Sequence, residues 1–473
     1  MNIKSKNGVK IKIINSLYHL IPKILREPFY KIIKGDISGR MARGSFWLLS
    51  GTIVSRGIML ICSIVIAHFI GKSQFGEFGI IQSTINMFFV FGGFGLGLTT
   101  TKYVAEFRNK NPEKAGNIIA ATNLTAGLLG LFFTISFILL APLIANKAIN
   151  APYLVDKIRL GSIMLFFCWL NGAQTGTLAG FEDFKSIAKI SVWTGIIFLP
   201  IQIICTYIWG LSGAIIGLGL FYMSQWIFNY FFIKKTTSRF NVKIKISRRL
   251  KDFSYLFSFS LPAIMAGMIV GPVTWYCNTM MVNRINGFGE MAIYNAALQW
   301  QNIVLFIPTA VSQISLPLFS HSMDDKGKFI KLIKYNILLN FIIGFSFAAI
   351  IAICSKLIMY GYGKNFIDGS IVLVILSFTA VLISVNGVIG QVIAGIGKMW
   401  VGFILNLIWA SAFVYFSYIL LNKGYGALGL SYAMLFSYLI HTVTTTCLVI
   451  YYLRKNLSDN KIFKRIIQLW QGK

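Results

Sequence analysis

Arg56 is the only basic residue that stands well inside a long apolar run of this sequence, and no acidic residue lies near it in the chain. A charged side chain at membrane depth costs roughly 3 kcal/mol or more, so it is a functional candidate by default. Its planar guanidinium can bind a phosphate group through two parallel hydrogen bonds. The alternatives are a structural bond to backbone carbonyls and a side chain that extends to the membrane surface. We predict an anion-binding role for Arg56.

Amide and indole side chains inside the apolar runs form a second group that could bind a polar ligand. Amides can hydrogen-bond hydroxyl groups, and indole rings can stack on the flat face of a ring. Without a ligand, the amides would bond neighbouring helices and the indoles would anchor at the membrane interface. The members of this group are Asn171, Gln174, Asn278, Gln299, Gln313, Trp275 and Trp300. Three further cations stand at the ends of apolar runs, namely Lys102, Arg108 and Arg284.

The sequence contains no arrangement of residues that is typical of an enzyme or a metal site. Its six cysteines stand singly in apolar segments, without the close pairs that zinc sites and disulfide frameworks show. Its four histidines are scattered, although His68 and His441 could relay protons. We therefore predict no catalytic residue, no metal and no cofactor. Coupling to a proton or sodium gradient stays open, and the shortage of Asp and Glu in the apolar runs disfavours a dedicated carboxylate ion site.

The composition is that of a membrane protein. Hydrophobic residues make up 56% of the 473 residues and charged residues 12%, about half the charged share of an ordinary soluble domain. The formal net charge of +30 would suggest a nucleic-acid partner in a soluble protein. Here the Lys and Arg residues are mostly confined to short connections between apolar runs. We interpret them as topology signals and contacts to membrane lipids, and we predict no nucleic-acid partner.

Twelve apolar runs are each long enough to cross a hydrocarbon core of about 30 Å as a helix. The termini and connections on one side of these runs hold 35 Lys and Arg residues, and the connections on the other side hold 8. The positive-inside rule therefore places both chain termini in the cytoplasm. The predicted spans are 45–70, 78–99, 117–141, 160–180, 187–209, 212–233, 254–281, 290–318, 329–354, 368–396, 399–421 and 427–453.

Short motifs recur along the chain at a nearly constant offset. The stretch FGE at 75–77 returns at 288–290, and NG at 171–172 returns at 386–387. Because six spans separate the copies, both halves enter the membrane in the same sense, as in a parallel repeat around a central cavity. We expect Gly76 or Gly289 to permit a tight turn, and small residues such as Gly172, Gly176 and Gly180 to let helices approach closely.

These observations predict an all-α, polytopic membrane protein with about twelve transmembrane helices in two parallel six-helix repeats around a central cavity. The first bundle is expected at 44–233 and the second at 254–453, joined by a basic cytoplasmic linker at 234–253. A basic amphipathic segment that lies on the membrane surface is expected at 1–43, and a basic cytoplasmic tail at 454–473.

Three segments of the chain resemble the polysaccharide and O-antigen flippase branch of the MOP exporter superfamily. RGSFWLLSGTIVSRGIMLICSIVIAHFIGKSQFGEFGII is similar to the first-span region of that branch, which ends in a Gly-x-x-x-(Phe/Tyr)-Gly pattern. GFGLGLTTTKYVAEFRNKNPEKAGN and LNGAQTGTLAGFEDFKSIAKI are similar to its second and fourth span endings. The resemblance covers most of 43–453. It implies alternating-access transport of polyprenyl-diphosphate-linked oligosaccharide repeat units from the cytoplasmic to the outer leaflet of the cell membrane, for O-antigen, capsule or a related polymer.

The resemblance also implies roles for the candidate residues. Arg56 would meet the diphosphate, Lys102 and Arg108 would hold phosphate at the cytoplasmic mouth, and Arg284 would serve as an exit gate. The amides and the two indoles would contact the sugar. The partners would be the polyprenyl-diphosphate-linked glycan, membrane lipids and the glycan polymerase machinery. Ordinary contact with lipid headgroups is the alternative for the three peripheral cations.

Two other functions remain as alternatives. A drug or small-solute exporter of the same superfamily would favour a drier, aromatic cavity and often an intramembrane carboxylate, which the sequence does not clearly show. A membrane glycan polymerase or ligase would need a large external loop with catalytic Arg or His. The longest predicted external loop, 142–159, is short and holds few charged residues.

Overall fold

The computed structural model describes residues 36–245, 268–322, 326–395 and 399–456, and all the secondary structure in them is helical. The fold class predicted from the sequence is therefore confirmed. The long helices are α3 (Asp36–Phe107), α4 (Pro112–Leu143), α5 (Val155–Gly180), α6 (Phe184–Arg239), α8 (Val270–Val282), α9 (Gly287–Ser322), α10 (Lys326–Ile353), α12 (Ser370–Gly395), α13 (Met399–Asn422) and α14 (Gly426–Asn456). A short helix, α11 (Ser355–Tyr362), follows α10.

Helices α3 and α6 each consist of two helices that meet at a glycine. Gly71 in α3 has φ 75° and Gly210 in α6 has φ 54°, both in the left-handed region that residues with a side chain rarely adopt. With these two breaks, each of the twelve predicted spans has a helix in the described chain, although residues 254–267 of the seventh predicted span, 254–281, lie outside the described residues. Membrane-spanning length and apolar composition are clearest in seven stretches: Ser50–Phe88, Pro112–Ala148, Phe184–Arg239, Ile330–Ile353, Lys364–Ile393, Trp400–Asn422 and Gly426–Tyr451.

The prediction that Gly76 or Gly289 makes a tight turn is wrong. In the first half the chain turns at Gly71, and in the second half at Asn286, which has φ 54°. The FGE stretches come after these turns and lie at the start of the next helix. Gly76 is therefore needed for a different reason, which is close helix packing.

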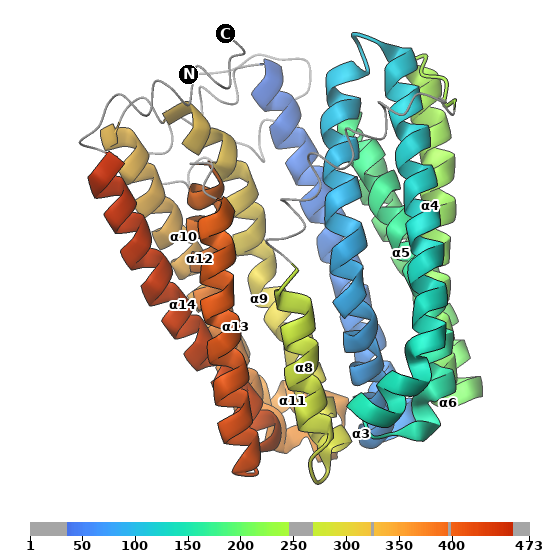
Figure 1. Cartoon of the computed structure of the whole chain (residues 1–473), viewed down its shortest axis with the longest axis vertical. Coiled ribbons are helices and arrows are strands. Elements are labelled where there is room, and N and C mark those ends of the chain that lie inside the picture. The colour runs from blue at the N-terminus through green and yellow to red at the C-terminus, as the bar shows by residue number, and fades with distance from the viewer. Residues whose placement is uncertain (1–35, 246–267, 323–325, 396–398, 457–473) are drawn as a thin grey trace.

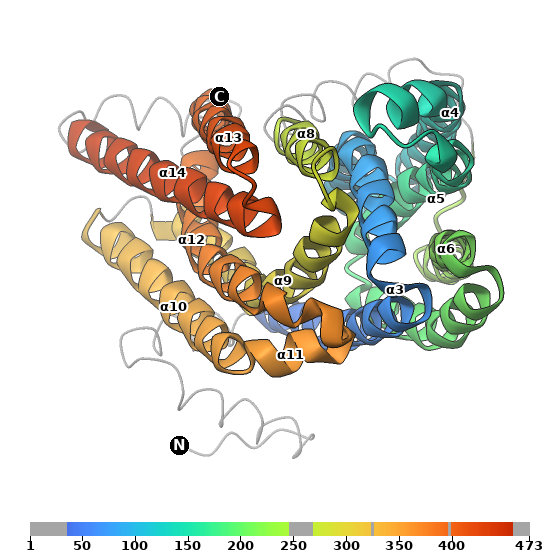
Figure 2. The same ribbon diagram turned by 90° about the horizontal axis from the view of Figure 1, so that it is seen from below.

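The helices form two bundles, α3–α6 and α8–α14, which lie side by side (Figures 1 and 2). Within the first bundle, α3 and α5 approach closely at glycines, as predicted. A Cβ on Gly176 would lie 2.3 Å from the Gly97 carbonyl oxygen, and one on Gly180 would lie 2.7 Å from the Val104 Cβ. The Thr101 hydroxyl uses this short separation to donate to the Gly176 carbonyl at 3.1 Å.

The repeated Asn of the NG motifs forms an interhelical hydrogen bond in both bundles. In the first bundle the Asn229 amide of α6 donates to Asn171 Oδ1 of α5 at 3.1 Å. In the second, Asn386 of α12 donates to the Thr442 hydroxyl of α14 at 2.8 Å. Asn229 and Thr442 are 213 positions apart, the same offset as the FGE copies. The two halves therefore share interhelical bonds as well as motifs.

The acidic residues of the two FGE stretches have different partners. Glu290 accepts a hydrogen bond from the Ala427 N–H at 2.8 Å, at the N-terminal end of α14. Glu77 instead accepts one from the Tyr153 hydroxyl at 2.9 Å. Partial burial, this hydrogen bond and the negative charge of Glu77 raise the pKa of Tyr153 to about 12. The phenol therefore stays protonated and remains a donor at neutral pH.

The described chain includes the beginning of the predicted linker. Helix α6 continues to Arg239, so the first residues of the predicted linker 234–253 are helical. The reason is local packing: the Thr236 hydroxyl donates to Asp183 Oδ2 at 2.7 Å, and Val242 is buried against Ala115 and Ile119 of α4. The remainder of the linker from 246, the segment 1–35 and the tail from 457 lie outside the described residues, and the division of the chain into these domains stays a prediction.

The two ends of the molecule differ. We call the end where α3 turns the Gly71 end, and the opposite end, where α3 finishes, the Arg108 end. Helix α11 lies at the Gly71 end, and α13 and α14 lean away from the first bundle towards the Arg108 end (Figure 1).

Candidate functional site

Arg56 lies between the two bundles, at the level of the middle of α9. Its Nη1 donates to the Asn302 carbonyl oxygen at 3.0 Å, and its guanidinium carbon lies 5.6 Å from the centroid of the Phe306 ring. Both partners belong to α9 of the second bundle. Arg56 is nevertheless exposed in this structure. The guanidinium therefore turns towards the opposite bundle and keeps donors free for a further acceptor, because a guanidinium carries five N–H groups.

Two of the predicted residues on α8 bond directly to the second helix of α3. The Trp275 indole nitrogen donates to the Thr84 hydroxyl at 3.0 Å, and the Asn278 amide donates to the Ser83 hydroxyl at 2.8 Å. Asn278 is only 2% exposed, and its Oδ1 has no hydrogen-bond partner. These two side chains thus lie at the interface between the bundles, and their contact with a ligand stays a prediction.

Helix α9 contributes the remaining predicted residues of this interface. Gln299 and Trp300 are half-buried at the level of Arg56, whereas the side chain of Gln313 lies outside the described residues. Asn295, on the same helix, was missed by the sequence analysis. It is 6% exposed, and its Nδ2 is buried without a partner. The signal that could have found it is the one used for the others, an amide inside an apolar run.

Asn171 and Gln174 lie elsewhere, in the interior of the first bundle. The Asn171 amide donates to the Tyr222 carbonyl at 2.8 Å and its oxygen accepts from Asn229 at 3.1 Å, so both ends of the amide are occupied within the bundle. Gln174 is 5% exposed and belongs to the same helix, α5. The structure therefore favours the interhelical alternative for Asn171, and a sugar contact for either residue stays a prediction.

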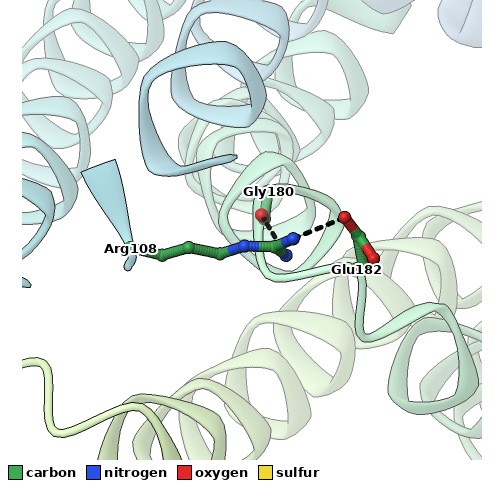
Figure 3. Close-up of polar contacts among 3 residues, drawn as sticks. All are labelled: Arg108, Gly180 and Glu182. Atoms are coloured by element: carbon green, nitrogen blue, oxygen red, sulfur yellow. Dashed lines mark hydrogen bonds and ion pairs between the residues drawn. The ribbon is translucent and has the colours of Figure 1, made fainter. Parts of the chain in front are cut away.

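Arg108 joins three elements at the Arg108 end (Figure 3). Its Nη1 donates to the Gly180 carbonyl at 2.9 Å, its Nη2 forms an ion pair with Glu182, and its guanidinium carbon lies 5.8 Å from the Phe240 ring centroid. The ends of α3, α5 and α6 are thereby held together. Lys102, one helical turn and a half earlier, is exposed, and its Nζ lies 5.1 Å from the Tyr103 ring centroid.

We expect Arg108→Met to lower the free energy of unfolding by about 1–3 kcal/mol, because it leaves a backbone carbonyl and a carboxylate without their charged donor. Glu182→Gln should cost less, about 1 kcal/mol or below, because the Glu182 side chain is 42% exposed. Thermal unfolding of the purified variants in detergent measures both effects. The double variant then gives the interaction energy between Arg108 and Glu182. If Arg108 instead holds phosphate, Arg108→Met will weaken substrate binding at unchanged stability.

Arg284 lies at the Gly71 end, in the connection between α8 and α9. Its Nη2 donates to Asn422 Oδ1 at the end of α13, so the contact stays within the second bundle. The neighbouring Asn283 donates to the Ala148 carbonyl of the first bundle at 2.7 Å. The described contact of Arg284 is thus with the second bundle, and the contact with the first bundle comes from Asn283. The exit-gate role of Arg284 stays a prediction.

A groove of about 510 Å³ lies between α8 and α13. Its lining is mainly apolar and includes three exposed tyrosines, and it contains none of the predicted ligand residues: Val273, Tyr276, Met280, Ala410, Ser411, Val414, Tyr415 and Tyr418. No group of three or more His, Cys, Asp or Glu residues that could hold a metal occurs in the described part of the chain. His68 bonds the Ile64 carbonyl at 3.0 Å, while His441 is half-buried in α14.

Comparison with protein families decides the relationship. Residues 41–323 match the model of the family described as polysaccharide biosynthesis protein, which is more than half of the chain. The chain belongs to this family. The matched region contains the first bundle together with α8 and α9, and therefore most of the candidate residues at the interface between the bundles.

Two named proteins resemble the chain at low sequence identity. The EPS I polysaccharide export inner membrane protein EpsE of Ralstonia nicotianae is 20% identical over 82% of this chain and 89% of its own. The capsular polysaccharide biosynthesis protein CapF of Staphylococcus aureus is 22% identical over 53% of this chain and 64% of its own.

A solved structure shares the fold. A multidrug resistance MATE family transporter of the MOP superfamily, in an inward-facing conformation, superposes with a TM-score of 0.74 at 16% identity, over 86% of this chain and 99% of its own. The chain described here therefore has the fold of MOP superfamily transporters and is a multi-pass membrane protein. The likeness concerns the fold and leaves the transported compound to other evidence.

Proposed function

We propose that this protein moves polyprenyl-diphosphate-linked oligosaccharide repeat units from the cytoplasmic to the outer leaflet of the cell membrane. Membership in the polysaccharide biosynthesis family supports a glycan precursor as the substrate, and the MOP transporter fold supports transport as the activity. The names of EpsE and CapF refer to exported and capsular polysaccharides. The transported repeat units would therefore be assembled into a surface polysaccharide.

The observation that supports this substrate class best is the position of Arg56. Its charged group lies between the bundles, in contact with α9 and far from either end of the helices that flank it. A charge at that depth is costly and is retained where it serves a substrate or an ion. A diphosphate is the part of the substrate that a guanidinium recognises through bidentate hydrogen bonds.

The charge distribution supports an orientation. The connections that meet at the Arg108 end belong to the side with 35 Lys and Arg residues, against 8 on the side of the Gly71 end. We therefore propose that the Arg108 end and both chain termini are cytoplasmic. The substrate would then enter between the bundles from the Arg108 end and leave at the Gly71 end.

Deleting the gene should abolish a surface glycan and leave lipid-linked repeat units inside the cell. Mass spectrometry of extracted lipids and staining of the cell surface measure the two effects, and a plasmid copy of the gene serves as the control. Normal surface glycan in the deletion strain would reject the proposal. Unchanged glycan combined with new sensitivity to cationic drugs would favour the drug or small-solute exporter that the sequence left as an alternative.

A further inference from the structure

The two FGE stretches touch each other across the interface between the bundles. A Cβ built on Gly76 would lie 1.8 Å from the carbonyl oxygen of Phe288 and 2.6 Å from its carbonyl carbon. Such distances are far below any tolerated contact, so only glycine allows the two backbones to come this close. Each copy of the repeated stretch thus packs on the other, and the contact joins the first bundle to the second.

The contact continues along the same faces of α3 and α9. One helical turn after Gly76, a Cβ on Gly79 would lie 3.1 Å from the Asn295 Cβ. Residues three apart on a helix share a face, as do residues seven apart, so Gly76 and Gly79 present a flat strip to Phe288 and Asn295. Small residues let membrane helices approach closely. At Gly76 the approach is to the backbone of Phe288, and at Gly79 it is to the side chain of Asn295.

Aromatic rings seal the same end of the molecule. Phe75 is fully buried, and its ring centroid lies 6.0 Å from that of Tyr362 and 6.0 Å from that of Phe366 in the second bundle. Further towards the middle, the bonds from Trp275 and Asn278 to α3 also cross the interface. Among the described side chains, the hydrogen bonds and ring contacts between the bundles run from the Gly71 end to the level of Arg56.

We propose that the doubled FGE stretch is the outer gate of the transporter, and that Gly76 is the positioning residue that lets this gate close. The gate is closed when Gly76 and Gly79 lie against Phe288 and Asn295, and it opens when the two faces separate. The inference rests on the proposed alternating-access transport. It identifies the contact between the bundles that must break in each transport cycle.

The chemistry of the contact suits a gate. The closest approach is between backbones and involves no ion pair, so separating it costs only packing and weak polar contacts. Asn278 Oδ1 and Asn295 Nδ2 are buried there without partners. A buried polar atom without a partner costs roughly 1–3 kcal/mol. That cost is relieved when the gate opens and water reaches both amides, which offsets part of the packing lost.

A disulfide across the contact tests whether the gate moves. The Cβ separation of 3.1 Å between positions 79 and 295 is close to the range of disulfides. In a variant whose six native cysteines are replaced, Gly79→Cys with Asn295→Cys should cross-link under oxidation. Cross-linking should reduce transport at least tenfold, and a reducing agent should restore it. A cross-linked protein that transports at the full rate would show that this contact is static and would overturn the proposal.

The role of Gly76 itself is tested by adding Gly76→Val to the same pair. The added side chain should hold the faces apart, lower the cross-link yield at least threefold and slow transport. Gly387→Ala is the matched control, because a Cβ there meets nothing within 4 Å. An unchanged yield with Gly76→Val would refute the positioning role. Because cross-link yield needs no substrate, it stays informative even if the glycan proves to be the wrong substrate.

Discussion

Arg56→Ala should reduce transport of the lipid-linked glycan by about 10- to 150-fold, which corresponds to the loss of a hydrogen bond to a charged group worth roughly 1.5–3 kcal/mol. The guanidinium lies between the bundles, bonds the Asn302 carbonyl and contacts the Phe306 ring, while its other donors remain available for the diphosphate. Flipping of a fluorescent polyprenyl-diphosphate glycan in proteoliposomes measures the loss directly.

Arg56→Lys should retain part of the activity, since the positive charge stays but the bidentate geometry is lost. The matched control is Arg159→Ala, because Arg159 is exposed and pairs with Asp156 one turn away, at 3.2 Å. If Arg56→Ala transports at the full rate while folding normally, the guanidinium acts only as a link between α3 and α9. Unfolding temperatures of the purified variants separate that structural role from substrate binding.

Gly176→Ala should lower the free energy of unfolding by about 1–3 kcal/mol, the usual cost of overpacking a close contact. The new Cβ would lie 2.3 Å from the Gly97 carbonyl oxygen and 2.8 Å from the Gly97 Cα, and neither backbone can move without separating α3 from α5. Loss of the Thr101 to Gly176 hydrogen bond would add to the effect. Thermal unfolding in detergent is the measurement.

Gly127→Ala is the control for this substitution. Gly127 also lies in a membrane helix, α4, but the nearest atom to its Cβ position is Leu170 Cδ2 at 3.9 Å. Alanine there should be neutral or stabilising by about 0.5–1 kcal/mol, the usual advantage of alanine over glycine in a helix. Equal unfolding temperatures for the two variants would contradict the close packing of α3 on α5.

The repeat could be recognised in the sequence, but the structural role of Gly76 in the FGE stretch could not. The FGE stretches predicted two equivalent halves, and the matching Asn171 and Asn386 bonds agree with that. The turn expected at Gly76 is instead made by Gly71. A glycine tolerates both a left-handed turn and a close helix contact, so its presence alone cannot distinguish the two uses.

The sequence alone was enough to predict the number of membrane helices, the two-fold repeat and the family resemblance. These follow from apolar runs of spanning length and from basic residues that interrupt them, both of which are local properties. The arrangement in space settled which polar groups meet. Asn171 and Asn278 look alike in the sequence, yet one joins helices inside the first bundle and the other reaches across to the opposite bundle. Lipid and protein interior are equally apolar, so a membrane helix carries little pattern that reveals which face is turned inward, and only packing with its neighbours determines that face.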